Sequence, residues 1–486
     1  MDSVRKARPP DPGLDAASLR ATFAVAREAS VRRGRPVLTV WTTPVPGTAP
    51  RALLRRADRL GGRVFFWSSR WTGVESVGIG SSLDVSAEGP SRFQVVRRAW
   101  HRHCQGLVTG GSAIAGQPGF PLVVGGFAFR PGRWNPIGGM PDALSWCPAV
   151  QLVRLGDGTT HLALTARVTP DTEVDSLAGR RADLARRLLA TPERDADDGS
   201  PGAVVRFDVP DATGWRRAVT AAVDEIRRGE LAKVVLARQV VLHAGRPFAV
   251  PAAVARLLGS TSEGAVFATR FSGRWFLGGT PECLVRVADG RVTADSLAGS
   301  MPRGATDADD AAWARALLHG AKTRHEQGLV TEFVTRALAQ CCTDVTALDR
   351  PQVMRLGSVQ HLVTTVTATV PAHGRAGLLD LAERLHPTPA MGGYPGPAAL
   401  RWLTRSEPFD RGWYAAPVGW FDAVGEGELA VAIRSALVSG DRAALFAGCG
   451  VVAGSTPEDE YAETELKLHP MLAALDVPAA ATGRAA

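Results

Sequence analysis

The C-terminal part of the sequence gathers groups that bind small carboxylated molecules. Arg434, the glycine-rich stretch 448–454 and Lys467 supply a guanidinium, backbone N–H groups and an amine, while Glu460 and Glu463 supply carboxylates. Guanidinium and backbone N–H groups bind carboxylates directly, whereas carboxylate oxygens hold hard divalent cations such as Mg²⁺. This set predicts a site for a small polyanion that is held partly through a divalent cation.

A base and an acid are predicted further upstream. Lys233 stands at the mouth of a strongly apolar run, where desolvation and nearby cations lower a lysine pKa enough for general-base chemistry. Glu282 ends the turn 278–282, and a partly buried glutamate keeps a proton that it can donate to a leaving hydroxyl. Taken alone, a solvent-facing lysine and an ordinary hairpin turn fit these positions as well.

Two helices are predicted to carry metal ligands. Glu326 lies in a predicted helix or helix pair over 310–339, and Glu460 and Glu463 share one face of a helix that begins at Pro457. A glutamate from each helix, meeting in a cleft, would form a typical Mg²⁺ pair completed by water and substrate oxygen. Exposed amphipathic helices with surface ion pairs fit the same spacing.

The elements that position these groups follow from periodicity. Apolar residues recur at helical spacing over 215–228, and the strongly apolar stretch 231–242 follows as a predicted strand. In the first half, strand-like runs such as 36–41 and 121–129 alternate with arginine-rich helical stretches such as 183–189.

The predicted organisation is a variable N-terminal part over 19–200 and a motif-dense catalytic region over 201–475. The clearest linker, 195–202, divides them, although β-rich runs on both sides allow a single composite sheet system. Residues 1–18 and 476–486 are expected to be disordered tails that carry no chemistry.

Composition excludes several classes of protein. The 486 residues are 45% hydrophobic and 21% charged, as in ordinary globular proteins. No apolar run reaches the roughly 20 residues that span a bilayer, and no signal peptide is evident, so we expect a cytoplasmic protein that binds no membrane. The net charge of +8 is spread along the chain, which argues against nucleic-acid binding, and the six cysteines lack a C-x-x-C pair.

Cofactor motifs are also missing. The stretch 448–453 matches the loose G-x-G-x-x-A pattern, but helical character is delayed to about Pro457 and no fitting βαβ unit follows, which argues against a nicotinamide or flavin site. The phosphate-binding P-loop, the zinc-protease H-E-x-x-H motif and the G-x-S-x-G elbow are absent from the sequence.

Seven motifs occur in the order in which they occur in the chorismate-utilising enzymes, and they resemble those of the isochorismate synthases most. Together they cover about residues 210–473 almost continuously. They are KVVLAR at 233–238, GGTPE at 278–282, SLAGS at 296–300, KTRHE at 322–326, QHL at 360–362, LHPTPA at 385–390, and the C-terminal set from 409 to 467.

The resemblance implies an α+β fold, a single composite domain in which antiparallel sheets are flanked by helices. It implies an isomerase that converts chorismate to isochorismate by adding water at C2 with loss of the C4 hydroxyl, for menaquinone or siderophore biosynthesis. Lys233 would activate the water and Glu282 would protonate the departing hydroxyl. Mg²⁺ would be held by Glu326 and Glu463, with Glu460 close by. The substrate would contact Ala298, Gly299, Ser300, His361, Tyr414, Arg434, Gly450 and Lys467.

The resemblance also separates related activities. Aminodeoxychorismate synthases carry a nucleophilic lysine at the position of Ala298, so a small residue favours water, and we expect a monomer without a glutamine amidotransferase partner. Salicylate synthases, which add elimination of pyruvate, are the alternative, although the 386–390 loop resembles the isochorismate synthase version. A binding protein without turnover is disfavoured because the base and acid positions are filled. Thr323 and Gln327 replace an acidic residue and a histidine of many relatives, which predicts a changed outer shell of the metal.

Overall fold

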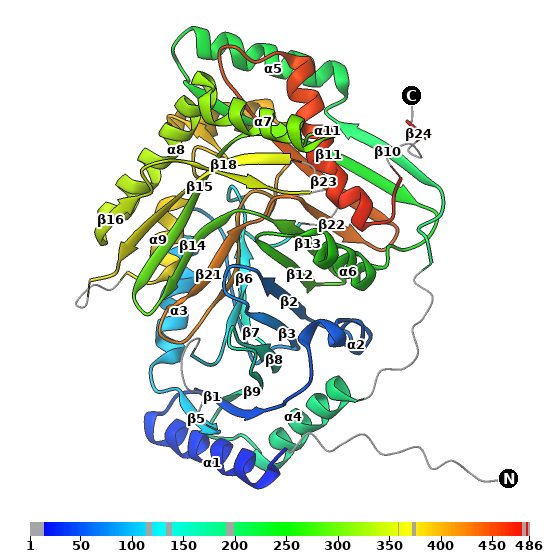
Figure 1. The fold of residues 1–486 in the computed structure, drawn as a ribbon. Helices are drawn as coiled ribbons and strands as arrows, with labels where there is room; N and C mark the ends of the chain where they lie inside the picture. Colours follow the sequence, from blue (N-terminus) through cyan, green and yellow to red (C-terminus); the bar gives the residue numbers. More distant parts are fainter. Residues whose placement is uncertain are drawn as a thin grey trace, which may run out of the picture.

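The computed structural model describes residues 14–112, 119–132, 139–190, 199–357, 359–371, 376–478 and 483–484. In this part of the chain the strands form a 14-stranded sheet and a 10-stranded sheet, both built almost wholly from antiparallel pairs (Figure 1).

The first sheet runs from a C-terminal strand at one edge to N-terminal strands at the other. Its strands, in spatial order, are β24 (Gly483–Arg484), β10 (Val204–Val209), β11 (Lys233–Ala244), β23 (Arg442–Val451), β22 (Ser435–Ser439), β13 (Arg274–Thr280), β12 (Ala265–Phe271), β2 (Val64–Ser69), β3 (Glu75–Ile79), β8 (Val150–Arg154), β9 (Thr160–Val168), β1 (Val37–Pro44) and β5 (Val108–Gly111), and β19 (Gly393–Tyr394) pairs with β11.

The second sheet is also built from both parts of the chain. Its strands, in spatial order, are β16 (Thr343–Ala347), β18 (Val359–Thr369), β15 (Arg291–Pro302), β14 (Cys283–Ala288), β21 (Gly427–Val431), β20 (Pro417–Phe421), β6 (Val123–Phe127), β7 (Ala143–Cys147) and β4 (Leu83–Ala87), and β17 (Gln352–Arg355) pairs with β18.

Helices cover the outer faces of the two sheets, whose inner faces pack on each other. The first sheet buries one apolar face under α1 (Ala16–Arg33), η1 (Pro50–Leu53), α2 (Leu54–Leu60), α4 (Val174–Leu189), α6 (Val250–Ser260) and α11 (Pro457–Ala474). The second sheet lies under α3 (Arg92–Cys104), α8 (Ala321–Ala339) and α9 (Leu378–Leu385). The core between the sheets contains Trp67, Trp146 and Trp413, and α5 (Ala212–Arg227) and α10 (Gly396–Ser406) pack against it.

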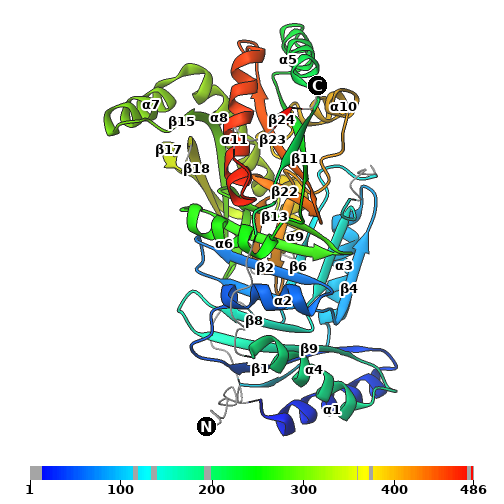
Figure 2. The same ribbon diagram turned by 90° about the vertical axis from the view of Figure 1, so that its right-hand side faces the viewer.

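The N-terminal and C-terminal parts of the chain are joined within both sheets, so they form a single composite domain as predicted. In the first sheet β2 pairs with β12, and in the second β6 pairs with β20. Figure 2 shows that α1 and α4 lie at the opposite end of the molecule from α7 (Asp307–His319), α8 and α11. The α+β architecture with flanking helices is therefore confirmed.

The predicted elements are largely present, with corrections at the ends of the chain. The helix pair expected over 310–339 is α7 and α8, separated at Gly320. The N-terminal tail was predicted too long, because Asp15 caps a helix that begins at Ala16. The C-terminal tail prediction is wrong at 483–484, which pair with β10. Residues 1–13, 195–198 of the linker, 479–482 and 485–486 lie outside the described residues.

No helix in the described ranges is long and apolar enough to cross a membrane.

Candidate active site

One cavity of about 190 Å³ brings together nearly all the candidate residues. Its lining residues lie on or beside β11 and β23 of the first sheet, β15 and β18 of the second, and α8 and α11. Figure 1 shows these elements at one end of the molecule. The lining residues are Lys233, Glu282, Leu297, Ala298, Gly299, Ser300, Met301, Thr323, Glu326, His361, Ala390, Met391, Ile433, Arg434, Gly450, Glu460, Glu463 and Lys467.

Lys233 is buried in this cavity rather than facing solvent. Only 3% of the residue is exposed, and its Nζ lies 3.7 Å from Oε2 of Glu326 on α8. Gly450 on the adjacent strand makes the room, because a Cβ there would lie 2.8 Å from Lys233 Cε. The lysine therefore occupies the boundary between core and cavity that general-base chemistry requires.

Glu282 is held by the short connection between β13 and β14. Thr280 Oγ1 donates a hydrogen bond of 2.6 Å to the Val431 carbonyl, and Pro281 fixes the next backbone angle. Glu282 is 2% exposed, and burial together with the nearby Asp295 carboxylate raises its pKa to about 8, against the opposing effect of surrounding cations. At neutral pH this carboxyl keeps its proton, as a general acid must.

His361 and Arg434 form a rigid, cationic wall. His361 Nδ1 donates to the Gly299 carbonyl at 2.9 Å, so Nε2 bears the lone pair and accepts from Arg434 Nη2 at 3.3 Å. Burial, followed by the charges of Arg434 and Lys467, lowers the pKa of His361 to about 3, which keeps the ring neutral. Arg434 itself adopts a left-handed backbone with φ of 50°, a conformation that is uncommon for residues other than glycine.

Helix α11 presents its acidic first turns and Lys467 to the cavity. Thr456 caps the helix and Pro457 begins it, which places Glu460, Glu463 and Lys467 on one face. Lys467 Nζ donates to the Gly448 carbonyl at 2.9 Å and pairs with the Glu463 carboxylate. Burial raises the pKa of Glu463, but the charge and hydrogen bond of Lys467 outweigh it, so the net shift is downward and the group stays ionised.

The predicted carboxylates lie in one cavity, although the described residues contain no group of three His, Cys, Asp or Glu side chains already arranged to hold a metal ion. Mg²⁺ usually takes one or two protein carboxylates and completes its shell with water and substrate oxygens. Glu326 and Glu460 are 7% and 4% exposed, and Glu463 is ionised. These residues therefore fit a hard divalent cation in ligand type, while Glu326 and Glu463 are each also paired with a lysine.

Tyr414 is the candidate that the structure does not bring to the cavity wall. It is 4% exposed and stacks on Phe446, with 5.2 Å between ring centroids, in the core between the sheets. Its hydroxyl lies toward the backbone of Gly448, behind the surface that Arg434 and Lys467 present.

The two departures from the family pattern have different surroundings. Thr323 lines the cavity and packs so closely on the bulged residue Gly299 that a Cβ there would lie 2.3 Å from Thr323 Cγ2. Gln327 instead turns to the second sheet, where its Nε2 donates to the Ser296 carbonyl at 2.8 Å and to Thr364 Oγ1 at 2.9 Å. The prediction that Gln327 alters the outer shell of the metal therefore has no contact to support it.

Sequence reasoning missed the apolar side of the cavity. Leu297, Met301, Ala390, Met391 and Ile433 line it together with the polar groups. Leu297, Ala390 and Ile433 lie inside the motifs that carry the polar groups, and the two methionines directly follow such motifs. Their position next to chemistry-bearing motifs was the available signal.

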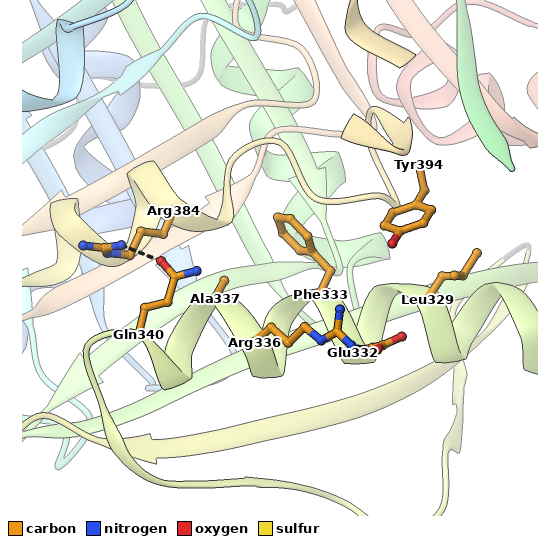
Figure 3. A pocket seen from close by; sticks show the side chains of 8 residues that line it. All are labelled: Leu329, Glu332, Phe333, Arg336, Ala337, Gln340, Arg384 and Tyr394. Carbon is orange, nitrogen blue, oxygen red and sulfur yellow. Dashed lines mark hydrogen bonds and ion pairs between the residues drawn. The ribbon is translucent and has the colours of Figure 1, made fainter. Parts of the chain in front are cut away.

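A second cavity of about 200 Å³ lies further along α8 (Figure 3). Figure 3 shows its lining residues: Leu329, Glu332, Phe333, Arg336, Ala337, Gln340, Arg384 and Tyr394. Arg336 pairs with Glu332 at 2.5 Å, and both side chains are more than half exposed. This cavity contains no counterpart of the buried Lys233 and Glu282 among its described lining residues, so the first cavity remains the candidate active site.

Comparison with known proteins identifies the family. The sequence matches the chorismate binding enzymes over residues 24–476. The isochorismate synthase MenF of Bacillus subtilis is 32% identical over 428 residues, which cover 86% of this chain and 89% of that protein. The salicylate biosynthesis isochorismate synthase of Pseudomonas aeruginosa is 34% identical over 469 residues, which cover 94% of each chain.

Solved structures agree with this assignment. The structure of MenF, the menaquinone-specific isochorismate synthase from Escherichia coli, matches with a TM-score of 0.76 and 26% identity, over 94% of this chain and 100% of that one. Anthranilate synthase component I from Streptococcus pneumoniae shares the fold, with a TM-score of 0.64 and 19% identity, over 84% and 89% of the two chains. Since the family match spans nearly all of the sequence, and the fold agrees along its length, this chain belongs to the chorismate-binding enzymes.

Proposed function

We propose that this protein is an isochorismate synthase, which converts chorismate to isochorismate and so feeds menaquinone or siderophore biosynthesis. The observation that carries the proposal is the pairing of a buried lysine with a protonated carboxyl in one cavity, Lys233 and Glu282. The relatives that match over most of their length are named isochorismate synthases, which agrees with this chemistry.

In the proposed reaction Lys233 takes a proton from water as the water oxygen bonds to C2 of chorismate. Both ring double bonds shift by one position, and the C4–O bond breaks as Glu282 donates its proton to the departing hydroxyl, which leaves as water. The small side chain of Ala298 leaves room for the attacking water beside the lysine. One hydroxyl is gained and one is lost, so the reaction is an isomerisation without a redox cofactor.

The carboxylates of chorismate meet a cationic wall. Arg434 and Lys467 are the cations, and the backbone at Gly450 lies open to the cavity because it has no side chain. Charge-assisted hydrogen bonds from such donors fix orientation, which is the larger part of positioning a water and a leaving group. His361 supports this wall by keeping the Arg434 guanidinium in place.

Mg²⁺ is proposed as the cofactor. Glu326 and Glu463 would hold it, with Glu460 close by, and the ion would neutralise a ring carboxylate of the substrate. The charge of the cavity supports this, because a dianionic substrate entering beside three carboxylates needs a compensating cation.

A second candidate is salicylate formation, in which pyruvate is eliminated from isochorismate in the same cavity. It is favoured by the relative from P. aeruginosa, whose name joins isochorismate synthase to salicylate biosynthesis. That relative is nevertheless named a synthase of isochorismate, so the first candidate is preferred.

The deciding experiment is a chromatographic assay of purified protein with chorismate, in Mg²⁺ and in EDTA. Isochorismate formed only with Mg²⁺ and without pyruvate is the expected result. Salicylate with pyruvate would replace the proposal by the second candidate, and no conversion would leave a chorismate-binding protein without turnover.

A further inference from the structure

Three buried ionic side chains lie beside the catalytic strand, and we call them the buried triad: Arg130, Glu407 and Arg411. The side chains of Glu407 and Arg411 are completely inaccessible, and that of Arg130 is 9% exposed. Arg411 Nε donates to both oxygens of Glu407, at 3.0 and 3.1 Å, and Arg130 Nη2 donates to Glu407 Oε2 at 3.2 Å. The proposed reaction uses none of the three.

The triad completes a gap in the pairing of β11. On this edge β11 pairs with β19 at 233–234 and with β10 from 239 onward. Between these points Arg411 Nη2 donates to the Val235 carbonyl at 2.6 Å, and the Ala237 N–H donates to Glu407 Oε1 at 3.1 Å. Two charged side chains therefore make, at Val235 and Ala237, hydrogen bonds that a neighbouring strand would otherwise make.

The same guanidinium also holds a second segment that lines the cavity. Arg411 Nη1 donates to the Met391 carbonyl at 2.9 Å, and Met391 lines the catalytic cavity. Arg411 thus connects the strand that carries the base to the loop that carries part of the apolar wall. A lysine could not make both contacts, because only the planar guanidinium presents N–H groups in several fixed directions.

The third member connects this arrangement to the N-terminal part of the chain. Arg130 follows β6, and its neighbour Phe129 lies under the Arg411 guanidinium, with 4.2 Å from the guanidinium carbon to the ring centroid. The Phe129 N–H donates to the Gly412 carbonyl at 2.7 Å. Phe129 and Arg130 do not line the catalytic cavity, but they contact Arg411 and Glu407, which hold β11 and the Met391 carbonyl.

Stability alone is a poor explanation for such a triad. Desolvating three charges costs several kcal/mol per ion, and buried ion pairs replaced by apolar residues of similar volume often leave stability unchanged or higher. The hydrogen bonds of Arg411 are instead directional. They end on the carbonyl of Val235, two residues after Lys233, and on the carbonyl of Met391, which lines the cavity.

We propose that the buried triad is a positioning device that sets the place of Lys233 relative to the 386–391 loop. The inference rests on the proposed function for its catalytic consequence, although the placement itself can be measured without turnover. A displacement of about 1 Å of a catalytic group costs about 10²-fold in rate, so loss of the triad is expected to lower kcat by about that factor. The KM for chorismate should stay unchanged, because the carboxylate-binding residues lie on other elements.

The first test is the triple variant Arg130→Met, Glu407→Leu, Arg411→Met, which removes all charge and keeps volume. We expect a folded protein with a lower melting temperature, because the Val235 and Met391 carbonyls and the Ala237 N–H lose their partners, and a kcat about 10²-fold lower when it is measured well below that temperature. A folded triple variant with wild-type kcat would overturn the proposal. Wild-type protein that makes no isochorismate would instead refute the proposed function. Whether the triad positions β11 would then be decided by hydrogen exchange of Arg411→Lys.

The second test is Arg411→Lys, which keeps the charge beside Glu407 and also serves if the triple variant does not fold. Hydrogen exchange of the peptide 233–238 should become faster in this variant, because the contact that holds the Val235 carbonyl is lost. The control is Glu75→Gln, which removes the charge of another buried carboxylate, on β3, where Glu75 is 2% exposed and accepts from the Arg51 backbone N–H at 2.8 Å, although the Arg51 side chain that pairs with it is 45% exposed. Equal exchange in Arg411→Lys and wild type, or equal acceleration in the control, would show that the triad does not place the strand.

Discussion

Replacing Glu282 by glutamine isolates the proton that this residue is proposed to deliver. Glutamine keeps the volume and hydrogen-bonding shape of a neutral carboxyl, but it has no proton to transfer at neutral pH. General acid catalysis contributes about 10²–10⁴-fold, so Glu282→Gln should lower kcat/KM by about that factor, equivalent to about 3–5 kcal/mol of transition-state stabilisation.

The pH dependence gives the same residue a second signature. Because burial raises the pKa of Glu282 to about 8, the protonated form dominates at pH 7, and wild-type kcat/KM should fall as pH rises through about 8. The residual kcat/KM of Glu282→Gln should not fall as pH rises through about 8. If another group causes the fall in the wild type, the variant will show the same fall.

The free energy of unfolding should also depend on the protonation of Glu282. The folded pKa lies above the ordinary value of 4.5, so the stabilisation is fully present below pH 4.5 and is lost as pH rises to about 8. At about 1.4 kcal/mol per pH unit, the wild type should lose about 5 kcal/mol relative to Glu282→Gln across this window. Urea unfolding of both proteins at several pH values measures the difference. Parallel stability curves would refute a raised pKa, and wild-type activity of the variant would refute the acid assignment.

Three further substitutions follow from distances in the cavity. Lys233→Ala should remove isochorismate formation while circular dichroism stays unchanged; unaltered turnover would exclude this lysine as the base. Gly450→Ala places a methyl group 2.8 Å from Lys233 Cε, so kcat should fall about tenfold or more with little change in melting temperature, and an unchanged kcat would contradict that crowding. Gly299→Ala should destabilise the protein by about 1–3 kcal/mol, because φ is 70° and the methyl meets Thr323; denaturant unfolding measures this, and Thr323→Ser should recover part of the loss.

The polar half of the site could be predicted from sequence because charged residues inside apolar stretches are conspicuous. Lys233 opens a run of buried residues, and Glu463 and Lys467 are spaced for one face of a helix. Helical periodicity also predicted α5 and α8, and a continuous apolar run predicted β11. Such patterns are local, so the sequence alone reveals them.

The remaining features depend on contacts between distant segments. Tyr414 was predicted to hold substrate, but its ring packs on Phe446 in the core, and nothing in the local sequence distinguishes a buried tyrosine from one that faces a ligand. Gln327 was assigned to the metal's surroundings, but its amide is directed at Ser296 on β15. In both cases the direction of a side chain depends on which element packs beside it.

In the part of the chain that the structure describes, the N-terminal residues build the fold around the cavity without lining it. Among the described residues, those that line the cavity lie between 233 and 467, yet β12 and β20 of the catalytic region pair with β2 and β6 of the N-terminal part. Separating the two parts would leave unpaired strand edges and expose the tryptophan-rich core between the sheets, which a stable fold cannot tolerate. Chemistry constrains the cavity residues directly, whereas the N-terminal part has to preserve only its sheet edges, its inner apolar face and the contacts of Arg130. The motifs that carry chemistry therefore gather after residue 210, although both parts of the chain build one shared fold.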